Sequence, residues 1–484
     1  MMTESNNASH HLGGNLDEKI ESSQCVHPLC LPLTSRIDIV IKYMYVKHFM
    51  KQEDSNWFEK LYNEHIKVFN GFVENDGADK LGKEAFISSF KETIESIKVN
   101  GYLDEAEPIS LGQMGIPLDG AHRIAASLYF NTKVKVCASK NKEYVYNYKF
   151  FLNRGLKRKY IDPVAIEYCK LVPNSFVAIV YPSASGKDQN IEDIFSRWGE
   201  IFYRKEVRIN KFGARLLMRQ IYAGEEWLGS WKTGFSGANS KASSCFRGGG
   251  VARVFVINSS VENMVRAKEE IRELFNIGKH SIHITDIQDE SIQLAQVLLN
   301  DNSVYFLNNA KNKYFPNFYA FLKQYKSLFE NDKHDIENYC IDGSSVLSAF
   351  GIRDSRDLDY LHHSNCQTLN GGEYIHSHNE EAKYYDIEIA DIISDPSNYF
   401  YLDGVKFVSL NIIYNMKRKR SEVKDLIDVK KINLLLSRKK TPRERFSLSS
   451  FFDLFSAQEL LFKLEIFKTR LRYYIARFNK IIKK

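Results

Sequence analysis

Between residues 175 and 298, strand-type segments alternate with segments of helical spacing, and this alternation limits the folds available to the chain. The strand-type segments are SFVAIVYP, EIFYRKEVRIN and VARVFVIN. Each is followed by a segment whose apolar residues recur three or four positions apart, which is typical of a helix with one buried face. The β-α-β-α-β-α order predicts an α/β domain in which helices pack on a sheet.

The full chain of 484 residues is long enough for about three domains. We expect a multidomain α/β (α+β) protein, with a ferredoxin-like α/β sandwich over residues 171–305. Three helical segments between residues 36 and 100 precede a strand, a glycine turn, a second strand, a helix and a third strand. Residues 1–33 are rich in Asn, Ser and His, and we expect them to form a disordered leader.

Charge is concentrated near the end of the sequence. The chain has 67 Lys and Arg residues against 60 Asp and Glu, and residues 463–484 contain eight basic residues and one acidic residue. The rest of the chain is therefore neutral, which argues against a body that coats nucleic acid. Seven scattered cysteines, a polar N-terminus and the lack of an apolar run of about 20 residues favour a reduced, cytoplasmic protein.

The segment IDGSSVLSAFGIRDSRDLDYL holds the most specific arrangement of chemically useful residues. Gly343-Ser344 is followed, after twelve residues, by Asp357-Leu358-Asp359. A glycine-serine turn at a helix start allows backbone N–H groups to approach a phosphate. Because side chains alternate along a strand, the next strand would present Asp357 and Asp359 on one face. Adjacent carboxylates repel each other unless cations neutralise them, so the pair predicts a Mg²⁺ site.

This arrangement resembles the hG[GS]…Dh[DE]h pattern of the DNA-polymerase-β-like nucleotidyltransferase superfamily. The resemblance implies a nucleotidyltransferase domain over residues 315–440, with Mg²⁺ and a nucleoside triphosphate, ATP or CTP, as cofactor and substrate. It also implies a third carboxylate on a later strand, which YYDIEIADII offers as Asp386 or Glu388. We expect Asp386 to join Asp357 and Asp359 as a metal ligand, while the choice between Asp386 and Glu388 stays open. Lys424, in the basic helical segment that follows, is a candidate for phosphate binding.

A second motif, GKHSIHITDIQDESIQLA, covers residues 278–295. It resembles the nucleoside diphosphate kinase motif, in which a phosphate-accepting histidine precedes a Ser-Asp pair and a helix. The resemblance places His283 at the phosphohistidine position, Asp286 in the pair and Arg272 at a phosphate-binding position. A neutral imidazole attacks a γ-phosphate well when nearby cations offset the developing charge. Tyr181 stands where that family has a phosphate-contacting lysine.

A third motif, LDGAHRIAA, covers residues 118–126. It resembles the DGxHR helix of the ParB/sulfiredoxin-like superfamily, whose members bind nucleotides, and implies such a domain over residues 34–145. We expect Asp119 to cap the helix, and His122 and Arg123 to face a phosphate together with the free N–H groups. The alternative is an ordinary capped helix in which Arg123 forms a surface ion pair.

The last segment predicts a basic amphipathic helical tail over residues 450–484. Apolar residues recur at steps of three or four between residues 460 and 482, and Lys and Arg occupy the opposite face. Such a helix fits an anionic membrane surface, so we expect a cytoplasmic protein that associates peripherally with the inner face of the membrane. Packing on the body of the protein and an oligomer seam are the alternatives.

Three phosphate-handling motifs in one chain favour a transferase of phosphorus-containing groups. We expect a Mg²⁺-dependent nucleotidyl- or phosphoryltransferase that acts on a small alcohol, sugar or glycan, with surface polysaccharide biosynthesis suggested by analogy. One alternative is a nucleotidyltransferase of toxin or defence type that modifies nucleic acid or protein. Another is a nucleotide-binding regulatory protein without catalysis. The expected partners are the nucleotide, the acceptor and an anionic membrane, and nucleic acid is not favoured.

Overall fold

The computed structural model shows a mixed α/β protein, which agrees with the expected class. It describes residues 23–74, 80–102, 106–142, 144–330 and 334–437. The basic tail over residues 450–484 and most of the predicted leader lie outside the described residues. The chain divides into two compact units, one formed by residues up to 50 and 59–147, the other by residues 51–58 and those from 148 onward.

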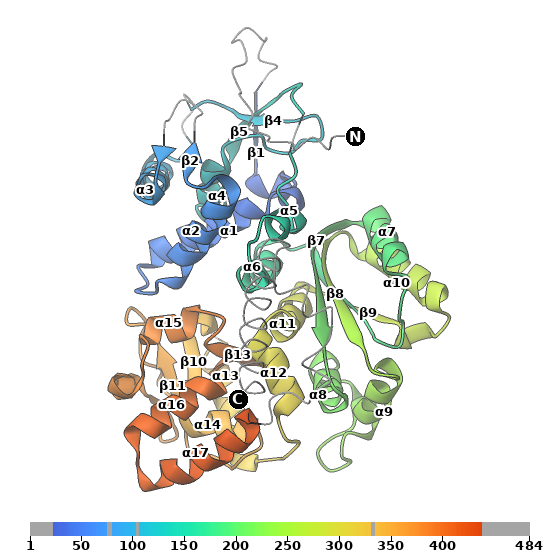
Figure 1. Ribbon diagram of the computed structural model, residues 1–484, viewed down its shortest axis with the longest axis vertical. Helices are drawn as coiled ribbons and strands as arrows, with labels where there is room; N and C mark the ends of the chain where they lie inside the picture. The colour runs from blue at the N-terminus through green and yellow to red at the C-terminus, as the bar shows by residue number, and fades with distance from the viewer. Residues whose placement is uncertain (1–22, 75–79, 103–105, 143, 331–333, 438–484) are drawn as a thin grey trace, which may run out of the picture. The chain divides into compact units, whose positions relative to one another are not determined.

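The first unit combines helices with a small three-stranded sheet (Figure 1). The sheet has the order β1-β5-β4, from β1 (Gln24–Val26), β5 (Val134–Ala138) and β4 (Ile109–Leu111). The helices are α1 (Ile37–Lys51), α2 (Trp57–Asn70), α3 (Lys83–Asn100) and α4 (Ala121–Tyr129), and β2 (Val73–Glu74) pairs with β3 (Lys80–Leu81). The prediction of disorder up to residue 33 was wrong from Gln24 onward, because β1 pairs along its length with β5.

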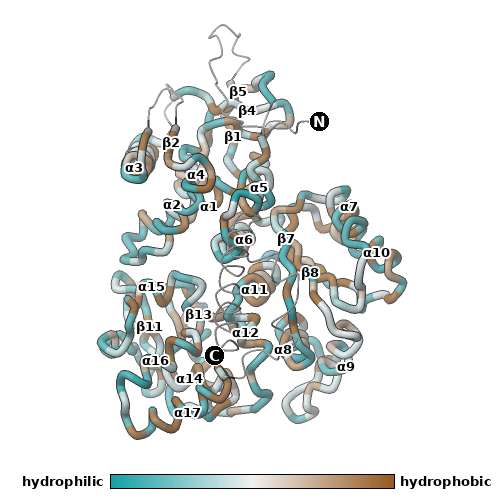
Figure 2. The backbone as a smooth tube through the Cα atoms, in the orientation of Figure 1, coloured by the Kyte–Doolittle hydropathy of each residue, from teal (hydrophilic) through white to brown (hydrophobic). Residues whose placement is uncertain are grey.

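The second unit begins with a four-stranded antiparallel sheet of order β7-β8-β6-β9. Its strands are β6 (Ser175–Val180), β7 (Glu200–Arg208), β8 (Val251–Asn258) and β9 (Ile282–Ile284). Helices α7 (Asp188–Trp198) and α10 (Val261–Phe275) share a core with β6, β8 and β9. Figure 2 shows both hydrophilic and hydrophobic residues along α7 and α10, as expected of helices with one buried face.

Four more helices surround this sheet. Helix α11 (Gln288–Leu298) packs on β6 and on α6 (Arg158–Leu171), which follows the short α5 (Tyr148–Asn153). Helices α8 (Lys211–Ile221) and α9 (Ser236–Cys245) are inserted between β7 and β8. The strands and helices predicted from the alternating pattern are present, and the resulting connectivity is β-α-β-β-α-β with this helical insertion.

A five-stranded mixed sheet follows in the same unit, with the order β12-β11-β10-β14-β13. Its strands are β10 (Tyr339–Asp342), β11 (Leu358–His362), β12 (Ile375–Ser377), β13 (Tyr399–Leu402) and β14 (Val405–Val408). The helices around it are α12 (Asp301–Asn309), α13 (Pro316–Ser327), α14 (Gly343–Ala349), α15 (Ile389–Ser394), α16 (Leu410–Arg420) and α17 (Val423–Leu436). All four residues of central β10 are buried, so the end of this strand lies inside the domain.

Two predicted elements of this region were wrong. The segment YYDIEIADII forms no strand: Asp386, Ile387 and Glu388 are all exposed in an irregular stretch, and α15 begins at Ile389. A short period-2 pattern does not distinguish a strand from a loop that leads into a helix. The basic helical segment that contains Lys424 is not one helix but two, α16 and α17, because Ser421 has a left-handed backbone with φ of +57°. Among the helices of the described residues, none has the length and hydrophobicity needed to cross a membrane.

Candidate functional site

Gly343 joins the central strand β10 to helix α14. Its φ of +61° lies in the left-handed region that favours glycine. A Cβ placed on Gly343 would lie only 2.5 Å from Oδ2 of Asp359. A residue without a side chain therefore lets the start of α14 approach Asp359, and this explains the glycine of the motif in physical terms.

The two predicted carboxylates lie beside a third one that the sequence analysis missed. Asp342 on β10 lies directly opposite Asp359 on β11, and Asp359 lies next to His376 on β12. Residues directly opposite on paired strands point to the same face of the sheet. Asp357, two residues before Asp359, has its Oδ1 3.5 Å from the Oγ of Ser344. The structure thus brings the Gly-Ser turn and three carboxylates to one place.

Asp342 is fully buried, and one of its carboxylate oxygens has no partner. Oδ2 accepts a hydrogen bond from the Tyr385 hydroxyl and lies 2.6 Å from Nδ1 of His378. Oδ1 has no hydrogen-bond partner among the described residues. A buried polar atom without a hydrogen-bond partner is rare, because no hydrogen bond in the protein then offsets the free energy lost when the atom leaves water. This oxygen is therefore available to coordinate a cation.

The pKa values show how charge is distributed at this site. Burial and the nearby charges of Asp357 and Asp342 raise the pKa of Asp359 to about 6, although His378 opposes the shift. Burial also favours the neutral form of Asp342, but the hydrogen bond and charge of His378 outweigh it and lower the pKa of Asp342. The same contact raises the pKa of His378, although burial opposes the rise. Asp342 and His378 thus stabilise each other's charged forms, while Asp359 has no cation hydrogen-bonded to it among the described residues.

A buried ionic network holds the segment that precedes Asp357. Arg353 makes a bidentate contact to Asp428 on α17, with N–O distances of 2.8 and 2.9 Å. Lys417 on α16 lies 2.9 Å from Asp425 and 3.1 Å from Asp428, and all three side chains are buried. Arg420 adds a second bidentate contact to Asp425. The network fixes α16 and α17 to the connection between α14 and β11.

The remaining predicted residues of this domain do not join the carboxylates. Asp386 is exposed and pairs with Lys419 at 3.2 Å. Glu388 precedes α15 and is exposed. Lys424 is exposed and pairs with Glu422 at 3.0 Å. The expected strand would have brought Asp386 or Glu388 beside β11, and its absence explains why neither lies in the row formed by Asp342 and Asp359.

His283 lies on β9, at a cavity of about 400 Å³ with a basic lining. Burial, followed by the charge of Lys268, lowers the pKa of His283 to about 4. Its imidazole is therefore neutral at pH 7, and the Tyr222 ring meets it edge-on with centroids 5.2 Å apart. No acidic side chain lines this cavity among the described residues; its charged or imidazole groups are Lys241, Lys268, Arg272, Lys279, His280 and His283.

One cation of this basic cavity keeps a donor available. Arg272 pairs with Glu269, yet its buried Nε has no hydrogen-bond partner among the described residues. Asp286 is exposed and pairs with Lys268 at 3.1 Å. Tyr181 is buried and lies 3.4 Å from the Tyr222 hydroxyl, oxygen to oxygen. The two residues that the kinase motif placed near His283 are thus close to it. Arg272 lines the cavity, and Asp286 pairs with Lys268, which also lines the cavity.

The DGAHR segment differs from its expectation. Gly120, with φ of +68°, is the N-cap of α4, and no side chain caps this helix. The prediction that Asp119 caps α4 was therefore wrong, because Asp119 pairs instead with Arg123 at 3.3 Å. Arg123 also donates to Tyr102 and to the backbone oxygen of Glu107. His122 Nε2 lies 2.9 Å from the Tyr62 hydroxyl, so both residues already have partners inside the unit.

The carboxylate site fits a divalent cation by the chemistry of its donors. Mg²⁺ prefers carboxylate oxygens, and Asp342, Asp357 and Asp359 supply them, one with an unpartnered oxygen. Within the described residues, no group of three His, Cys, Asp or Glu side chains is already gathered closely enough to hold a metal ion. The fit to a divalent cation therefore rests on the carboxylate oxygens and their negative charge, because the described residues do not form a complete set of metal ligands.

Asp342, His376, His378 and Tyr385 were missed by the sequence analysis. Asp342 directly precedes Gly343, where the motif has an apolar residue, so a carboxylate at that position was the available signal. The alternation IHSH over residues 375–378 was the signal for a strand that places histidines beside Asp359. Comparison of the chain with family models, with curated proteins and with solved structures finds no match, so the family resemblances rest on the motifs alone.

Proposed function

We propose that the protein is a Mg²⁺-dependent nucleotidyl- or phosphoryltransferase whose reaction centre is formed by Asp342, Asp357 and Asp359. The observation that carries the proposal is the buried, unpartnered oxygen of Asp342 directly across the sheet from Asp359. Carboxylates that repel one another in a buried place are stabilised by binding a cation. The adjacent Gly343-Ser344 turn supports a phosphate-bearing ligand for that cation.

The reaction class follows from this arrangement. In nucleotidyl transfer, an acceptor hydroxyl oxygen bonds to the α-phosphorus, and the bond from that phosphorus to the bridging oxygen breaks. Pyrophosphate leaves with the electron pair, and the hydroxyl proton passes to a site carboxylate or to water. Bound Mg²⁺ would supply charge neutralisation on the phosphates. The chain's own contribution is to hold Asp357 and Asp359 through the network of Arg353 and to keep the turn at Gly343 open.

His283 supports a second, phosphoryl-transfer activity in the same unit. The four-stranded order β7-β8-β6-β9 is that of a ferredoxin-like sandwich, and His283 lies on its fourth strand in sequence. A neutral imidazole beside four Lys and Arg side chains is suited to accept a γ-phosphoryl group, because the cations offset its charge. In that step the nitrogen–phosphorus bond forms as the β–γ bridge breaks, and a nucleoside diphosphate leaves.

The acceptor follows less directly from the fold. We propose a small alcohol, sugar or glycan, in line with the motif resemblance. Peripheral binding to the inner face of a membrane remains a proposal that depends on residues 460–484, which lie outside the described residues. The toxin-type and non-catalytic alternatives are outcomes of the experiment below.

Purified protein is incubated with Mg²⁺ and α- or γ-labelled ATP or CTP, with membrane and soluble extracts as acceptors. We expect the α-label to appear on an acceptor and to fall at least about 1,000-fold in Asp357→Asn/Asp359→Asn, because the cation site is lost. Asp386→Asn, an exposed carboxylate of the same domain, is the matched control and should keep activity. Transfer that survives the double variant contradicts the carboxylate assignment.

The α-label reports nucleotidyl transfer and the γ-label reports phosphoryl transfer to His283, so the two activities are measured separately. His283→Ala should lose acid-labile γ-label on the protein while keeping α-label transfer. Label on RNA, DNA or protein instead of a small acceptor would favour the toxin-type alternative. Nucleotide binding without any product, unchanged in the double variant, would favour the non-catalytic one.

A further inference from the structure

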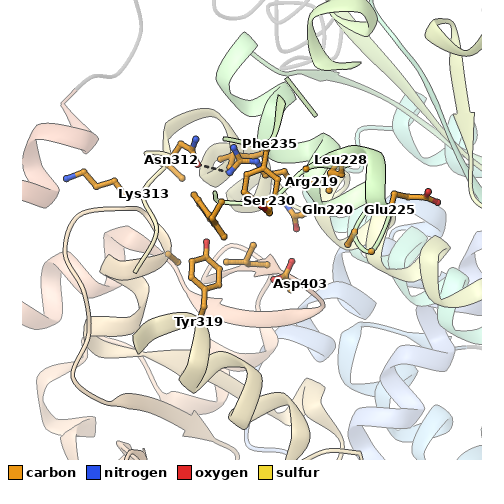
Figure 3. Close-up of a pocket in the computed structure, with 18 of the residues that line it drawn as sticks. Arg219, Gln220, Glu225, Leu228, Ser230, Phe235, Asn312, Lys313, Tyr319 and Asp403 are labelled. Atoms are coloured by element: carbon orange, nitrogen blue, oxygen red, sulfur yellow. Dashed lines mark hydrogen bonds between the residues drawn. The ribbon is translucent and has the colours of Figure 1, made fainter. Parts of the chain in front are cut away.

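A further cavity of the second unit lies away from both motifs and is assigned to neither. It has a volume of about 690 Å³, within the usual range for small-molecule sites. Its walls come from α8, the loop between α8 and α9, the connection from α12 to α13, and the turn between β13 and β14 (Figure 3). Ala349, at the far end of α14 from Gly343, also lines it. Six residues of helix separate the two by about 9 Å along the axis, so this is a second location.

Arg219 is the first feature that points to a ligand. Its guanidinium stacks on Phe235 and Trp231, with distances of 3.9 and 5.0 Å to the ring centroids. It donates to Oδ1 of Asn312 at 2.6 Å, while its buried Nε has no partner among the described residues. No carboxylate forms an ion pair with Arg219 in this part of the chain, and burial lowers its pKa. A guanidinium held on aromatic rings without a counter-ion is suited to bind an anion.

Gln220, the next residue on α8, is the second feature. Both ends of its amide, Nε2 and Oε1, are buried without a hydrogen-bond partner among the described residues. An amide with a free donor and a free acceptor matches a flat group that presents an acceptor beside a donor, as the edge of a nucleobase does. Gln220 therefore adds a recognition element that a simple anion would not use.

Aromatic and hydroxyl groups complete the cavity. Burial raises the pKa of Tyr319 to about 12, so its hydroxyl keeps its proton, and Figure 3 shows that hydroxyl directed toward the space below Arg219. Trp231 packs on Tyr319, and both lie on the same wall. Glu225 lines the rim, but its carboxylate extends away from Arg219 in Figure 3.

The cavity thus offers flat apolar faces, the Arg219 guanidinium and one unpaired amide. Lys311 and Lys313 also line it. So do the carboxylates of Glu226 and Asp403, and burial raises the pKa of Asp403 and so favours its neutral form.

From these features we propose that this cavity binds an anionic, ring-bearing small molecule of the mononucleotide class. The anion contacts Arg219, and the ring edge bonds to Gln220 while its face packs on the aromatic wall. The proposal does not depend on the carboxylate site, because no residue of that site lines the cavity. Gln220 also lines a smaller cavity of about 250 Å³, and His283 lines that smaller cavity too. The test must therefore distinguish binding in the cavity of Arg219 from binding in the basic cavity of His283.

The test is titration of the full-length protein with AMP, followed by tryptophan fluorescence and calorimetry. We expect saturable binding with a Kd below about 1 mM, and adenosine should bind at least about tenfold more weakly because it lacks the anion. Arg219→Leu and Gln220→Leu should each weaken AMP binding about tenfold or more, and Arg219→Lys should retain part of it. Arg215→Leu, one turn earlier on α8 and not in the lining, is the matched control and should bind as the unaltered protein does.

Three results would overturn the proposal. The first is the lack of saturable AMP binding, and the second is adenosine binding as tightly as AMP. The third is binding that survives in Arg219→Leu but is lost in Lys268→Ala/Arg272→Ala, which would place the ligand in the basic cavity of His283. Thermal unfolding and circular dichroism identify a variant that fails to fold, and Gln220→Leu and Arg219→Lys then decide the outcome.

Discussion

Two groups of carboxylates lie in the same domain, and only one of them is neutralised by the chain. Asp425 and Asp428 are buried against Lys417, with Arg420 and Arg353 as further partners. Asp359 and Asp357 lie at the end of the central strands with no Lys or Arg paired to either among the described residues. The first group is a structural network, because every charge has a partner inside the fold. The second group has no such ion pair, although the charges of Arg353 and His378 act on Asp357 and Asp359, so a bound cation would contribute there.

The pKa directions follow the same division. The charges of Arg420 and Lys417, with their hydrogen bonds, lower the pKa of Asp425 to about 2 against the effect of burial. Burial and neighbouring carboxylates raise the pKa of Asp359 to about 6. The basic cavity of His283 is the opposite case, a cluster of cations without acidic residues in its lining. Two of these cations, Lys268 and Arg272, pair with carboxylates outside the lining. A lining whose charges have one sign, rather than the presence of charge, therefore distinguishes the candidate sites from the scaffold.

Replacing Lys417, the cation that Asp425 and Asp428 share, should have the largest effect on stability. Lys417→Met leaves two buried carboxylates without their shared lysine, and we expect it to lower the free energy of unfolding by about 3–5 kcal/mol. Urea denaturation measures the change. Lys424→Met, an exposed lysine at the start of α17, should stay within about 0.5 kcal/mol. Equal losses of stability in Lys417→Met and Lys424→Met would contradict the expectation that the buried network stabilises the fold more than a surface ion pair does.

Removing the negative charge of Asp359 should instead increase the free energy of unfolding. The pKa of Asp359 in the folded chain, about 6, exceeds the ordinary value of 3.8. The folded chain therefore binds this proton more tightly, and the associated stability is present below pH 4 and lost as the pH rises to 6 and beyond. Asp359→Asn should accordingly raise the free energy of unfolding by about 1–3 kcal/mol at pH 8 without Mg²⁺.

The pH profile of that variant provides the control. The gain from Asp359→Asn should shrink as the pH approaches 4, where Asp359 is protonated and resembles asparagine. Urea denaturation in chelator between pH 4 and pH 8 measures this trend, and Asp386→Asn should show no gain at any pH. A loss of stability in Asp359→Asn at pH 8 would mean that Asp359 already has an effective partner within the chain.

The smallest expected effect concerns the turn that brings α14 against Asp359. Gly343→Ala adds a Cβ 2.5 Å from Asp359, whereas Gly372→Ala, at a similar φ of +68°, meets open space. Both variants pay the cost of a left-handed backbone, of the order of 1 kcal/mol, so their difference isolates the contact with Asp359. We expect Gly343→Ala to be the less stable by about 1 kcal/mol or more in thermal unfolding. Identical unfolding of the two would show that the turn does not need to approach Asp359.

Local patterns predicted the secondary structure of the second unit better than they predicted its site. Three strands of the four-stranded sheet were predicted from the sequence, and the fully buried residues 175–180 gave the strongest signal. The short β9 was missed. The hairpin β13–β14 was missed, although Asp403-Gly404 is a typical two-residue turn with positive φ at both positions. The Gly-Ser and Asp-Leu-Asp spacing correctly identified the helix that begins at Gly343 and the strand β11 that follows it.

The third carboxylate could not be located by spacing, because cross-strand register brings Asp342 to Asp359. Seventeen positions of chain separate the two residues, and only the antiparallel pairing of β10 with β11 makes them neighbours. His378 likewise reaches Asp342 from the position directly after β12, a strand that the sequence did not lead us to expect. Tyr385 was read as part of a strand, yet its hydroxyl bonds to Asp342 from an irregular segment. Tertiary contacts of this kind are invisible to periodicity.

The central claim, that Asp342, Asp357 and Asp359 bind a divalent cation together with nucleotide, is tested most directly by Mn²⁺ titration. Mn²⁺ serves as a paramagnetic substitute for Mg²⁺, and electron paramagnetic resonance reports its free concentration in the presence of a triphosphate that resists cleavage between the α- and β-phosphates. We expect saturable Mn²⁺ binding in the unaltered protein and in Asp386→Asn, and its loss in Asp357→Asn/Asp359→Asn. Mn²⁺ binding of equal strength in all three proteins would contradict the account.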